Sequence, residues 1–309
     1  MVFPPALYLP SGSSIHEFDE EPWEDIERDP RGILLMFEPR RSGAKYIMGM
    51  DSSEGITGWS RATRQPDDKK IDNGAIEVYE IGAIREPVWK IENGKKVPEI
   101  DKRTRRQKIH FRDVQVAEFR APCDAVEIAR IANIIGRIYH DDDGEPAELI
   151  WESWPGCGML CTQELLRLQY GNLWHWEYIS DVAEETDRLG WRSNRESMKL
   201  LWYRTRRHLM QENVVIRSKW LRQEYADAVI DYDKMRAMAD YGDHDDLMMA
   251  SNLALWAGNR WTYEMESSQE VATENANPTD FQNYAPGLGD DASWETWKSE
   301  QMSGWEGWE

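Results

Sequence analysis

The sequence predicts an α/β fold in which a mixed β-sheet carries helices on both faces. Three observations support this expectation. Apolar runs typical of strands come first and then alternate with amphipathic segments typical of helices. A strand meander followed by strand–helix–strand crossovers produces a sheet with antiparallel and parallel neighbours, covered by helices. The chain of 309 residues, 40% hydrophobic and 30% charged, is long enough to bury a full core.

The first part of the chain predicts the strand meander. Residues 46–50 form a short apolar run that ends at Asp51, a pattern typical of a buried strand followed by a turn. Two segments that alternate apolar and polar residues, 74–83 and 113–120, predict the next strands. The connection at residues 90–109 is polar and contains an Asn-Gly turn signal, so these two strands are expected to form a long-looped antiparallel pair.

The second part predicts helices alternating with two more strands. Asp124 suits the cap of a helix over residues 125–139, with buried positions expected at Val126, Ala129, Ile134, Ile135 and Ile138. The remaining elements are expected at 148–151 (a strand ending at Glu152), 160–169 (helix), 173–179 (strand), 193–211 (helix, opened by the capping-box signature Ser193–Glu196), 214–217 (extended), 220–230 (helix) and 244–257 (helix). Three strands, helix, strand, helix, strand and further helices is the order of RNase H-like folds.

Composition divides the chain into three regions. Residues 1–44 are expected to form an extended N-terminal arm with one short strand at 33–37. Residues 45–261 predict the folded α/β domain. Residues 262–309 hold 11 Asp/Glu against one Lys, so they carry half of the net charge of −20, and they predict a disordered acidic tail with four tryptophans. The tail is interpreted either as a solubilising segment or as a docking peptide whose tryptophans bind a partner.

Acidic residues stand where strands end or a helix begins. Asp51 follows the first strand, Glu152 follows the fourth, and Asp245 and Asp246 open the last helix. If the first and fourth strands are parallel neighbours, their carboxyl ends lie side by side, where open α/β sheets place their ligand sites. Carboxylates that converge there repel one another unless a cation lies between them. Oxygen ligands favour Mg²⁺ or Mn²⁺.

Such a site suggests phosphodiester chemistry. Two ions bridged by a shared carboxylate activate a water molecule and stabilise the leaving 3′ oxygen. Asp51 is the expected bridging ligand, with Glu152 on one ion and Asp245 or Asp246 on the other. The alternative is that these acids are turn and cap residues, because Asp also stabilises a helix N-terminus without any metal.

Three segments resemble the nuclease domain of the tailed-phage terminase large subunit. They are YIMGMDSSEG, AELIWESWPGCG and, most specifically, YGDHDDLMMASNLALW. The intervening LGWRSNRESMKLLWYRTRRHL is similar to the family's Gly-containing loop and Lys-bearing helix. The resemblance covers about residues 45–261. It implies an RNase H-like fold, with Asp51, Glu152 and Asp245 as catalytic ligands of two Mg²⁺ or Mn²⁺ ions and Asp246 as a further ligand.

The resemblance implies an endonuclease that cuts double-stranded DNA during viral genome packaging. Its implied partners are a packaging ATPase, a small terminase subunit and the portal, and its implied place is the host cytoplasm and, transiently, the procapsid portal. Two departures stand out. The chain contains no G-x-x-x-x-G-K-[ST] loop, so ATP hydrolysis is not assigned to it. The family's auxiliary Asp has only a displaced candidate, Asp72, after an insertion at 56–71.

Basic residues form two candidate DNA contacts. Phosphate attraction needs a local basic face and not a basic protein. The candidates are Lys102, Arg103, Arg105, Arg106 and Lys108 in the long connection, and Lys199, Arg206 and Arg207 on the helix after residue 193. The alternative is a solvated loop and a charge-balanced helix.

Other functions remain open at this point. Another RNase H-like nuclease, such as a Holliday-junction resolvase or a transposase, needs the same acids. A non-catalytic docking module would use them structurally. A sugar-kinase or actin-like fold requires a duplicated domain that the sequence lacks. Cys157, Cys161 and His175 lack the second ligand pair of a zinc site and are interpreted as small or packing residues. Neither a secretory signal nor a run of about 18 apolar residues is present, so no membrane association is expected.

Overall fold

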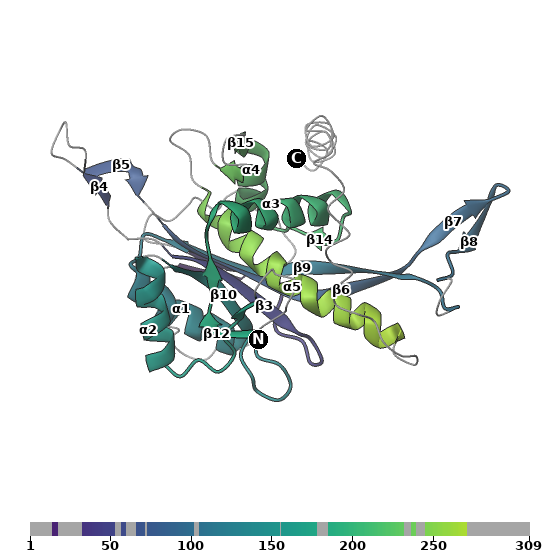
Figure 1. Cartoon of the computed structure of the whole chain (residues 1–309), viewed down its shortest axis with the longest axis horizontal. Coiled ribbons are helices and arrows are strands. Elements are labelled where there is room, and N and C mark those ends of the chain that lie inside the picture. The colour runs from purple at the N-terminus through teal and green to yellow at the C-terminus, as the bar shows by residue number, and fades with distance from the viewer. Residues whose placement is uncertain are drawn as a thin grey trace.

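The computed structural model describes part of the chain in detail. The described residues are 14–17, 33–52, 57–59, 66–71, 73–101, 105–154, 156–177, 185–231, 236–238 and 245–270. In this part, a mixed multi-stranded sheet is combined with five helices (Figure 1). The predicted α/β class is confirmed at this level.

The elements follow the predicted order with some shifts of their bounds. The main sheet contains β1 (Ser14–Glu17), β2 (Ile33–Met36), β3 (Tyr46–Asp51), β6 (Gly74–Pro87), β9 (Ile109–Ala121), β10 (Glu148–Trp154), β13 (Trp191–Arg192) and β14 (Val214–Val215). Four two-stranded sheets pair β4 (Thr57–Trp59) with β5 (Pro66–Ile71), β7 (Trp89–Glu92) with β8 (Lys95–Pro98), β11 (His175–Glu177) with β12 (Glu185–Leu189), and β15 (Val229–Asp231) with β16 (Arg236–Met238). The helices are α1 (Ala125–Ile138), α2 (Cys157–Arg167), α3 (Arg195–Met210), α4 (Lys219–Asp227) and α5 (Asp246–Glu270).

The strand order brings the two predicted acid-bearing strands together. Along the sheet the order is β1-β2-β9-β6-β3-β10-β13, with β14 beside β9. β3, β6 and β9 are antiparallel neighbours, whereas β10 runs parallel to β3, with Gly49 opposite Ile150 and Met50 opposite Trp151. Continuing this register places Asp51 beside Glu152 at the carboxyl ends of the two strands.

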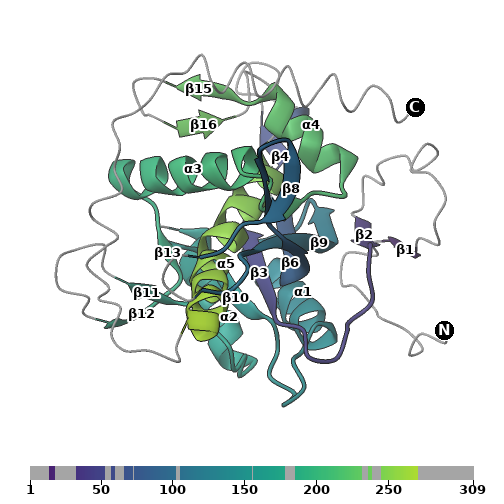
Figure 2. The same ribbon diagram turned by 90° about the vertical axis from the view of Figure 1, so that its right-hand side faces the viewer.

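The sheet separates two hydrophobic cores, one on each face. Met48 and Met50 of β3 pack with residues of α1 and α2, whereas Ile47 packs with residues of α3, α4 and α5. Figure 2 shows α1 and α2 on one side of the sheet and α3 and α4 on the other. Since side chains alternate between the faces of a strand, Gly49 and Asp51 share the face of Ile47, which is covered by α5.

Helix α5 approaches β3 so closely that only glycine fits between them. A Cβ atom at Gly49 would lie 1.9 Å from the carbonyl oxygen of Ala250 and 2.7 Å from the amide nitrogen of Ala254. Gly49 therefore allows backbone-to-backbone packing of the helix on the strand. This contact holds the beginning of α5, and with it Asp245, over the edge of the sheet at which β3 ends.

Two local predictions differ in part from the structure. Of the positions expected to be buried on α1, Ala129 and Ile135 are buried, but Val126, Ile134 and Ile138 are only half-buried, because the helix turns its Ile128–Ile131–Ala132 face to the sheet. The segment predicted as a fifth strand, 173–179, is a strand at 175–177, and of its described residues Leu173 and Trp174 contact β10. It then leaves as the β11–β12 hairpin, and the returning β13 takes the place beside β10.

Elements near both ends of the chain lie outside the predicted bounds of the folded domain. β2 of the predicted N-terminal arm joins the sheet edge beside β9. Helix α5 continues to Glu270, beyond the predicted end at residue 257 and into the region predicted as tail. Residues 271–309 of that tail lie outside the described residues. In the part that is described, no helix has both the length and the apolar character needed to cross a membrane.

Candidate metal centre

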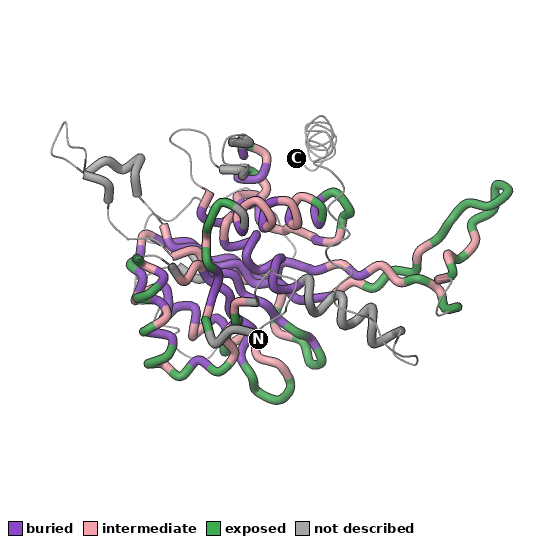
Figure 3. Tube along the Cα trace, viewed as in Figure 1, coloured by how far each residue is buried: buried purple, intermediate pink, exposed green. Residues whose placement is uncertain are grey.

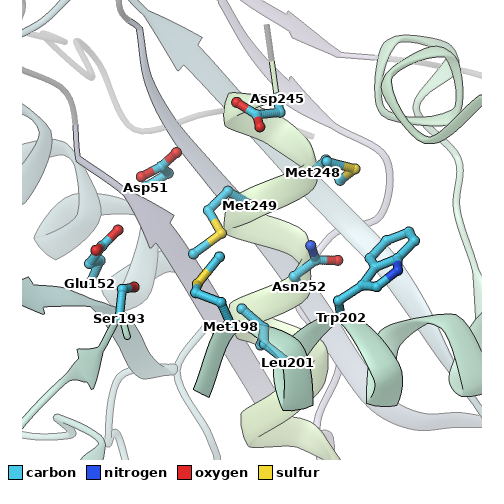
Figure 4. A pocket seen from close by; sticks show the side chains of 10 residues that line it. All are labelled: Asp51, Glu152, Ser193, Met198, Leu201, Trp202, Asp245, Met248, Met249 and Asn252. Carbon is cyan, nitrogen blue, oxygen red and sulfur yellow. The ribbon is translucent and has the colours of Figure 1, made fainter. Parts of the chain in front are cut away.

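A cavity of about 210 Å³ opens at the sheet edge where β3 and β10 end. Its walls come from the two strands, from α3 and from α5, as Figure 4 shows. The lining residues are Asp51, Glu152, Ser193, Met198, Leu201, Trp202, Asp245, Met248, Met249 and Asn252. The cavity is therefore lined by carboxylates, by the polar side chains of serine and asparagine, and by apolar side chains.

Three of the four predicted acids line this cavity. Asp51 comes from the last position of β3, Glu152 from β10 and Asp245 from the position before α5. On α5, Asp245, Met248, Met249 and Asn252 are spaced so that one helix face points to the cavity, as expected for a period of 3.6 residues. The structure thus brings together carboxylates that are separated by about a hundred residues of sequence.

Small residues position Glu152. A Cβ atom at Gly158 would lie 2.0 Å from the carbonyl oxygen of Glu152, so the first turn of α2 packs directly on the backbone of β10. The neighbouring Cys161 is buried, and its thiol donates to the carbonyl of Ala125 at 3.1 Å. Burial raises the pKa of Cys161 to about 12, so the thiol stays protonated near neutral pH. These contacts support the interpretation of this junction as packing and not as a zinc site.

The donor set fits hard divalent cations. Carboxylates with a nearby hydroxyl and amide are the ligands that Mg²⁺ and Mn²⁺ prefer. Among the described residues, no three Asp, Glu, His or Cys side chains converge closely enough to enclose a single ion. Mg²⁺ usually needs only one or two protein carboxylates and completes its shell with water and substrate phosphate.

Asp246, the fourth predicted ligand, has other partners. Its carboxylate accepts hydrogen bonds from Arg120 at 3.0 Å and from Asn73 at 3.2 Å, and it does not line the cavity. Arg120 also bonds Glu224 of α4 at 3.1 Å, and Glu224 accepts the backbone N–H of Met248 at 2.9 Å. This buried arrangement ties the first turn of α5 to the sheet and to α4. A ligand role for Asp246 stays a prediction.

Ser193 and Asn252 are cavity residues that the sequence analysis did not find. Ser193 was predicted to cap the helix that follows, but Asn194 has that role: its side chain accepts the N–H of Ser197 at 3.0 Å, while the Ser197 hydroxyl accepts the N–H of Asn194 at 2.9 Å. The Ser193 hydroxyl is instead buried beside the cavity and, within the described part, has no hydrogen-bond partner. The one-residue shift of the cap makes this oxygen available to a ligand.

The predicted basic residues lie in two places. Lys199, Arg206 and Arg207 are on α3, the helix that contributes Met198 and Trp202 to the cavity. Arg105, Arg106 and Lys108 lie instead beyond the opposite edge of the sheet, beside the β7–β8 hairpin. Lys102, Arg103 and Asp72, together with His244 next to the cavity acid Asp245, lie outside the described residues.

A second group of acids is buried in the sheet beneath α4 and α5. The side-chain nitrogen of Gln115 donates to Glu77 at 2.6 Å and to Glu118 at 3.4 Å, and all three residues are buried. Burial, reinforced by the negative charge of Glu118, raises the pKa of Glu77 well above its usual value. Glu77 therefore keeps a proton in the folded protein at a pH where the unfolded chain has released it.

We expect Glu77→Gln to remove part of the pH dependence of stability. Because the folded-state pKa of Glu77 is raised, its contribution to stability is lost as the pH rises above the ordinary carboxyl pKa of about 4.5. The melting temperature of Glu77→Gln minus that of the unmodified protein should therefore increase as the pH is raised from 5 to 8. Thermal denaturation followed by circular dichroism measures the difference. Glu86→Gln, on the exposed end of the same strand, is the control, and an equal gain there would contradict the prediction.

No protein-family model matches this sequence, and no curated protein matches it either. The chemistry of the cavity and the arrangement of the strands that support it are therefore the basis for assigning a function. The decisive feature is that Asp51, Glu152 and Asp245, which are far apart in the sequence, line the same cavity.

Proposed function

We propose that the protein is a metal-dependent endonuclease that hydrolyses phosphodiester bonds of double-stranded DNA. The observation that carries this proposal is the single cavity lined by Asp51, Glu152 and Asp245 at the carboxyl ends of two parallel strands. Open α/β sheets bind ligands at that edge, and carboxylates that line one cavity are typical ligands of Mg²⁺ and Mn²⁺.

We further propose that the fold is RNase H-like. The core order β9-β6-β3-β10, with three antiparallel strands followed by a parallel one, supports this assignment. So does the position of the acids: the first comes from the central strand β3, the second from its parallel neighbour β10, and the third from the last helix, α5. The resemblance of these segments to the terminase nuclease suggests the role of a viral packaging nuclease, with a packaging ATPase, a small terminase subunit and a portal as partners.

The residues have separate tasks in this proposal. Asp51 would bridge two ions, Glu152 would hold one of them and Asp245 the other. Bound Mg²⁺ or Mn²⁺ supplies the activation of water and the neutralisation of the leaving oxygen. Ser193 and Asn252 offer a hydroxyl and an amide for orienting water or phosphate. The apolar walls from Met198, Leu201 and Trp202 limit water around the acids, which strengthens electrostatic interactions inside the cavity. The cations of α3 would attract the DNA backbone.

The rival functions share parts of this site. A resolvase or transposase would use the same acids but would prefer four-way junctions or transposon ends over linear duplex. A docking module would keep the acids without binding metal.

Calorimetric titration with Mn²⁺ tests whether the protein binds metal, on which the proposal depends. We expect the full-length protein to bind Mn²⁺, with affinity strongly reduced by Asp51→Asn because the bridging carboxylate serves both ions. Asp143→Asn, in an exposed loop, is a matched control that should bind as the unmodified protein does. Equal heats for Asp51→Asn and the unmodified protein would favour the docking module.

A further inference from the structure

A long basic arm leaves the sheet at the edge opposite the candidate metal centre. We define the arm as residues 85–108, of which 102–104 are outside the described part. In the register of β6 with β3, Glu80 lies opposite Tyr46, so β6 residues beyond Glu80 extend past the first residue of β3, whereas Asp51 is at its other end. Figure 1 shows the arm, with β7 and β8, projecting from the body of the protein.

The length of the arm separates it from the acids. Twelve residues lead from Glu80 to Glu92 near the tip, which corresponds to roughly 40 Å of extended strand. Because the arm and Asp51 lie beyond opposite ends of β3, they do not contact the same phosphate of a DNA molecule. Any ligand of the arm is therefore held at a second place.

The arm is positively charged in a strongly acidic chain. Residues 85–108 contain nine Lys/Arg and four Asp/Glu, a net charge of +5, whereas the whole chain carries −20. The exposed cations in the described part are Arg85, Lys90, Lys95, Lys96, Arg105, Arg106 and Lys108. Some have acidic neighbours: Lys90 pairs with Glu92 at 2.6 Å and Lys108 with Glu99 at 2.5 Å. The concentration of cations nevertheless makes this a local basic surface.

The backbone of the arm is ordered by hydrogen bonds and a tight turn. Asn93 and Gly94 have φ angles of 52° and 74°, as a two-residue type I′ hairpin requires, and they join β7 to β8. At the base, the amide of Val88 donates to the carbonyl of Lys108 and the amide of Glu99 to that of Val88, both at 2.9 Å. The outer part of the arm is thus the two-stranded β7–β8 ribbon, and hydrogen bonds of Val88, Glu99 and Lys108 brace its base.

The side chains of the arm do not build a core. Trp89 is 45% exposed, Ile91 72% and Ile100 45%, and the ammonium of Lys96 lies 5.2 Å from the centre of the Trp89 ring. Figure 3 shows that exposure continues along both strands to the tip. These apolar side chains are therefore accessible to a partner on the surface of the arm.

The root of the arm continues the basic surface. A cavity of about 210 Å³ lies there between the loop before β3 and the beginning of the arm, and it is lined by Arg41, Lys45 and Arg85 together with Glu80. The carboxylate of Glu80 accepts two hydrogen bonds from Arg41, at 2.6 and 2.9 Å. Lys45 and Arg85 add positive charge next to this pair. Cations therefore extend from the root to the tip.

We propose that the arm is a second duplex-DNA-binding surface, which holds the DNA away from the site of cleavage. The major groove of B-DNA, about 12 Å wide, admits a two-stranded β-ribbon, and lysines and arginines on such a ribbon reach the flanking phosphates. The choice of DNA over an acidic protein segment follows from the shape of the ribbon and from the proposed endonuclease function, on which this inference rests. No base-specific role is assigned to the arm.

Binding of the full-length protein to a fluorescent 30-base-pair duplex tests this inference. We measure anisotropy in EDTA, so that cleavage does not interfere, for the unmodified protein and for Lys95→Gln/Lys96→Gln/Arg105→Gln. We expect at least about tenfold weaker binding near 0.1 M salt, and a salt slope smaller by up to about 2.7, since each lost phosphate contact reduces the slope by about 0.9. These side chains are exposed, so folding should be unaffected.

Two matched variants separate the effect of the arm from that of total charge. Arg137→Gln/Arg167→Gln/Arg188→Gln removes three exposed cations from α1, α2 and β12 and should bind the duplex within about twofold of the unmodified protein. Lys95→Arg/Lys96→Arg/Arg105→Lys keeps the charge of the arm and should also bind normally. Equal loss in the α1–α2–β12 variant would show a general charge effect and would overturn the proposal.

Other results overturn it as well. If the arm variant binds duplex as tightly as the unmodified protein, the arm is not a DNA contact. If a synthetic peptide of residues 262–309 binds the protein through the arm cations while the duplex does not, the arm is a protein-docking surface. The outcome is separable from the endonuclease proposal, because duplex binding is measured in EDTA, without divalent metal and without cleavage.

Discussion

Replacing Asp51 by asparagine is expected to reduce the rate of Mg²⁺- or Mn²⁺-dependent plasmid cleavage by on the order of a thousandfold or more. Metal ions stabilise the charge of a phosphodiester transition state by several kcal/mol, and about 4 kcal/mol corresponds to a thousandfold in rate. Asp51 ends the central strand β3 and lies between the other two acids in the proposed ion sites, so its loss affects both ions. Asparagine keeps the shape of the side chain but removes its charge.

The companion variants make this experiment specific. Glu152→Gln and Asp245→Asn should each impair cleavage strongly, while their melting temperatures stay close to that of the unmodified protein, because each change keeps the size of a side chain that lines a cavity. Asp143→Asn should cleave normally. Cleavage by Asp51→Asn at the rate of the unmodified protein, in preparations purified in parallel, would rule out the metal centre proposed for this cavity. Activity confined to four-way junctions would favour a resolvase.

Replacing Arg120 by methionine should destabilise the fold by about 3–5 kcal/mol, the usual cost of removing one partner from a buried ion pair. Arg120 lies on β9 and binds Asp246 at 3.0 Å and Glu224 at 3.1 Å, and all three side chains are buried. Burial already raises the pKa of Glu224 to about 8, while the charge of Arg120 opposes that rise. Without the guanidinium, both carboxyl groups lose the cation that they share. Urea denaturation followed by circular dichroism measures the change.

The control for Arg120 is on the same strand. Arg112 donates from its exposed side chain to the carbonyl of Glu212 at 2.8 Å, and Arg112→Met should cost less than about 1 kcal/mol. Adding Glu224→Gln and Asp246→Asn to Arg120→Met should recover part of the lost stability, since the buried charges are then removed together. A loss for Arg120→Met no larger than that for Arg112→Met would contradict a structural role for this buried arrangement.

The buried arrangement at Arg120 also explains why two adjacent acids differ. Asp245 and Asp246 are equivalent in a sequence pattern, because both open the same helix. In the fold, Asp246 turns toward Arg120 and Asn73, and Asp245 turns toward the cavity. The direction of each side chain depends on how α5 is rotated against β3 and β9, and the approach at Gly49 sets that packing.

Local sequence signals by themselves determined several features of this protein. The apolar run before Asp51 and the short run before Glu152 predicted two strands, since side-chain periodicity and turn residues act over a few positions. β3 ends at Asp51 as predicted, whereas β10 continues past Glu152 to Trp154. Asp124 predicted the start of α1, and its capping box with Glu127 is present. Asn93–Gly94 predicted a turn, because few residues other than these adopt positive φ at low cost. The turn joins β7 to β8, two strands in a connection that was predicted as a loop.

Tertiary packing alone decided the rest. Asn194 rather than Ser193 caps α3, β13 rather than residues 173–179 lies beside the far half of β10, and the arm carries its cations to the edge opposite the acids. In the first case, two adjacent residues have nearly equal local preferences for a helix cap. In the other two cases, pairing between strands far apart in sequence decided the outcome. Long-range contacts also fix which side chains share a cavity. The spacing of residues in the sequence identifies candidate site residues. The rotation of packed helices and the register of paired strands determine which of them face the same cavity.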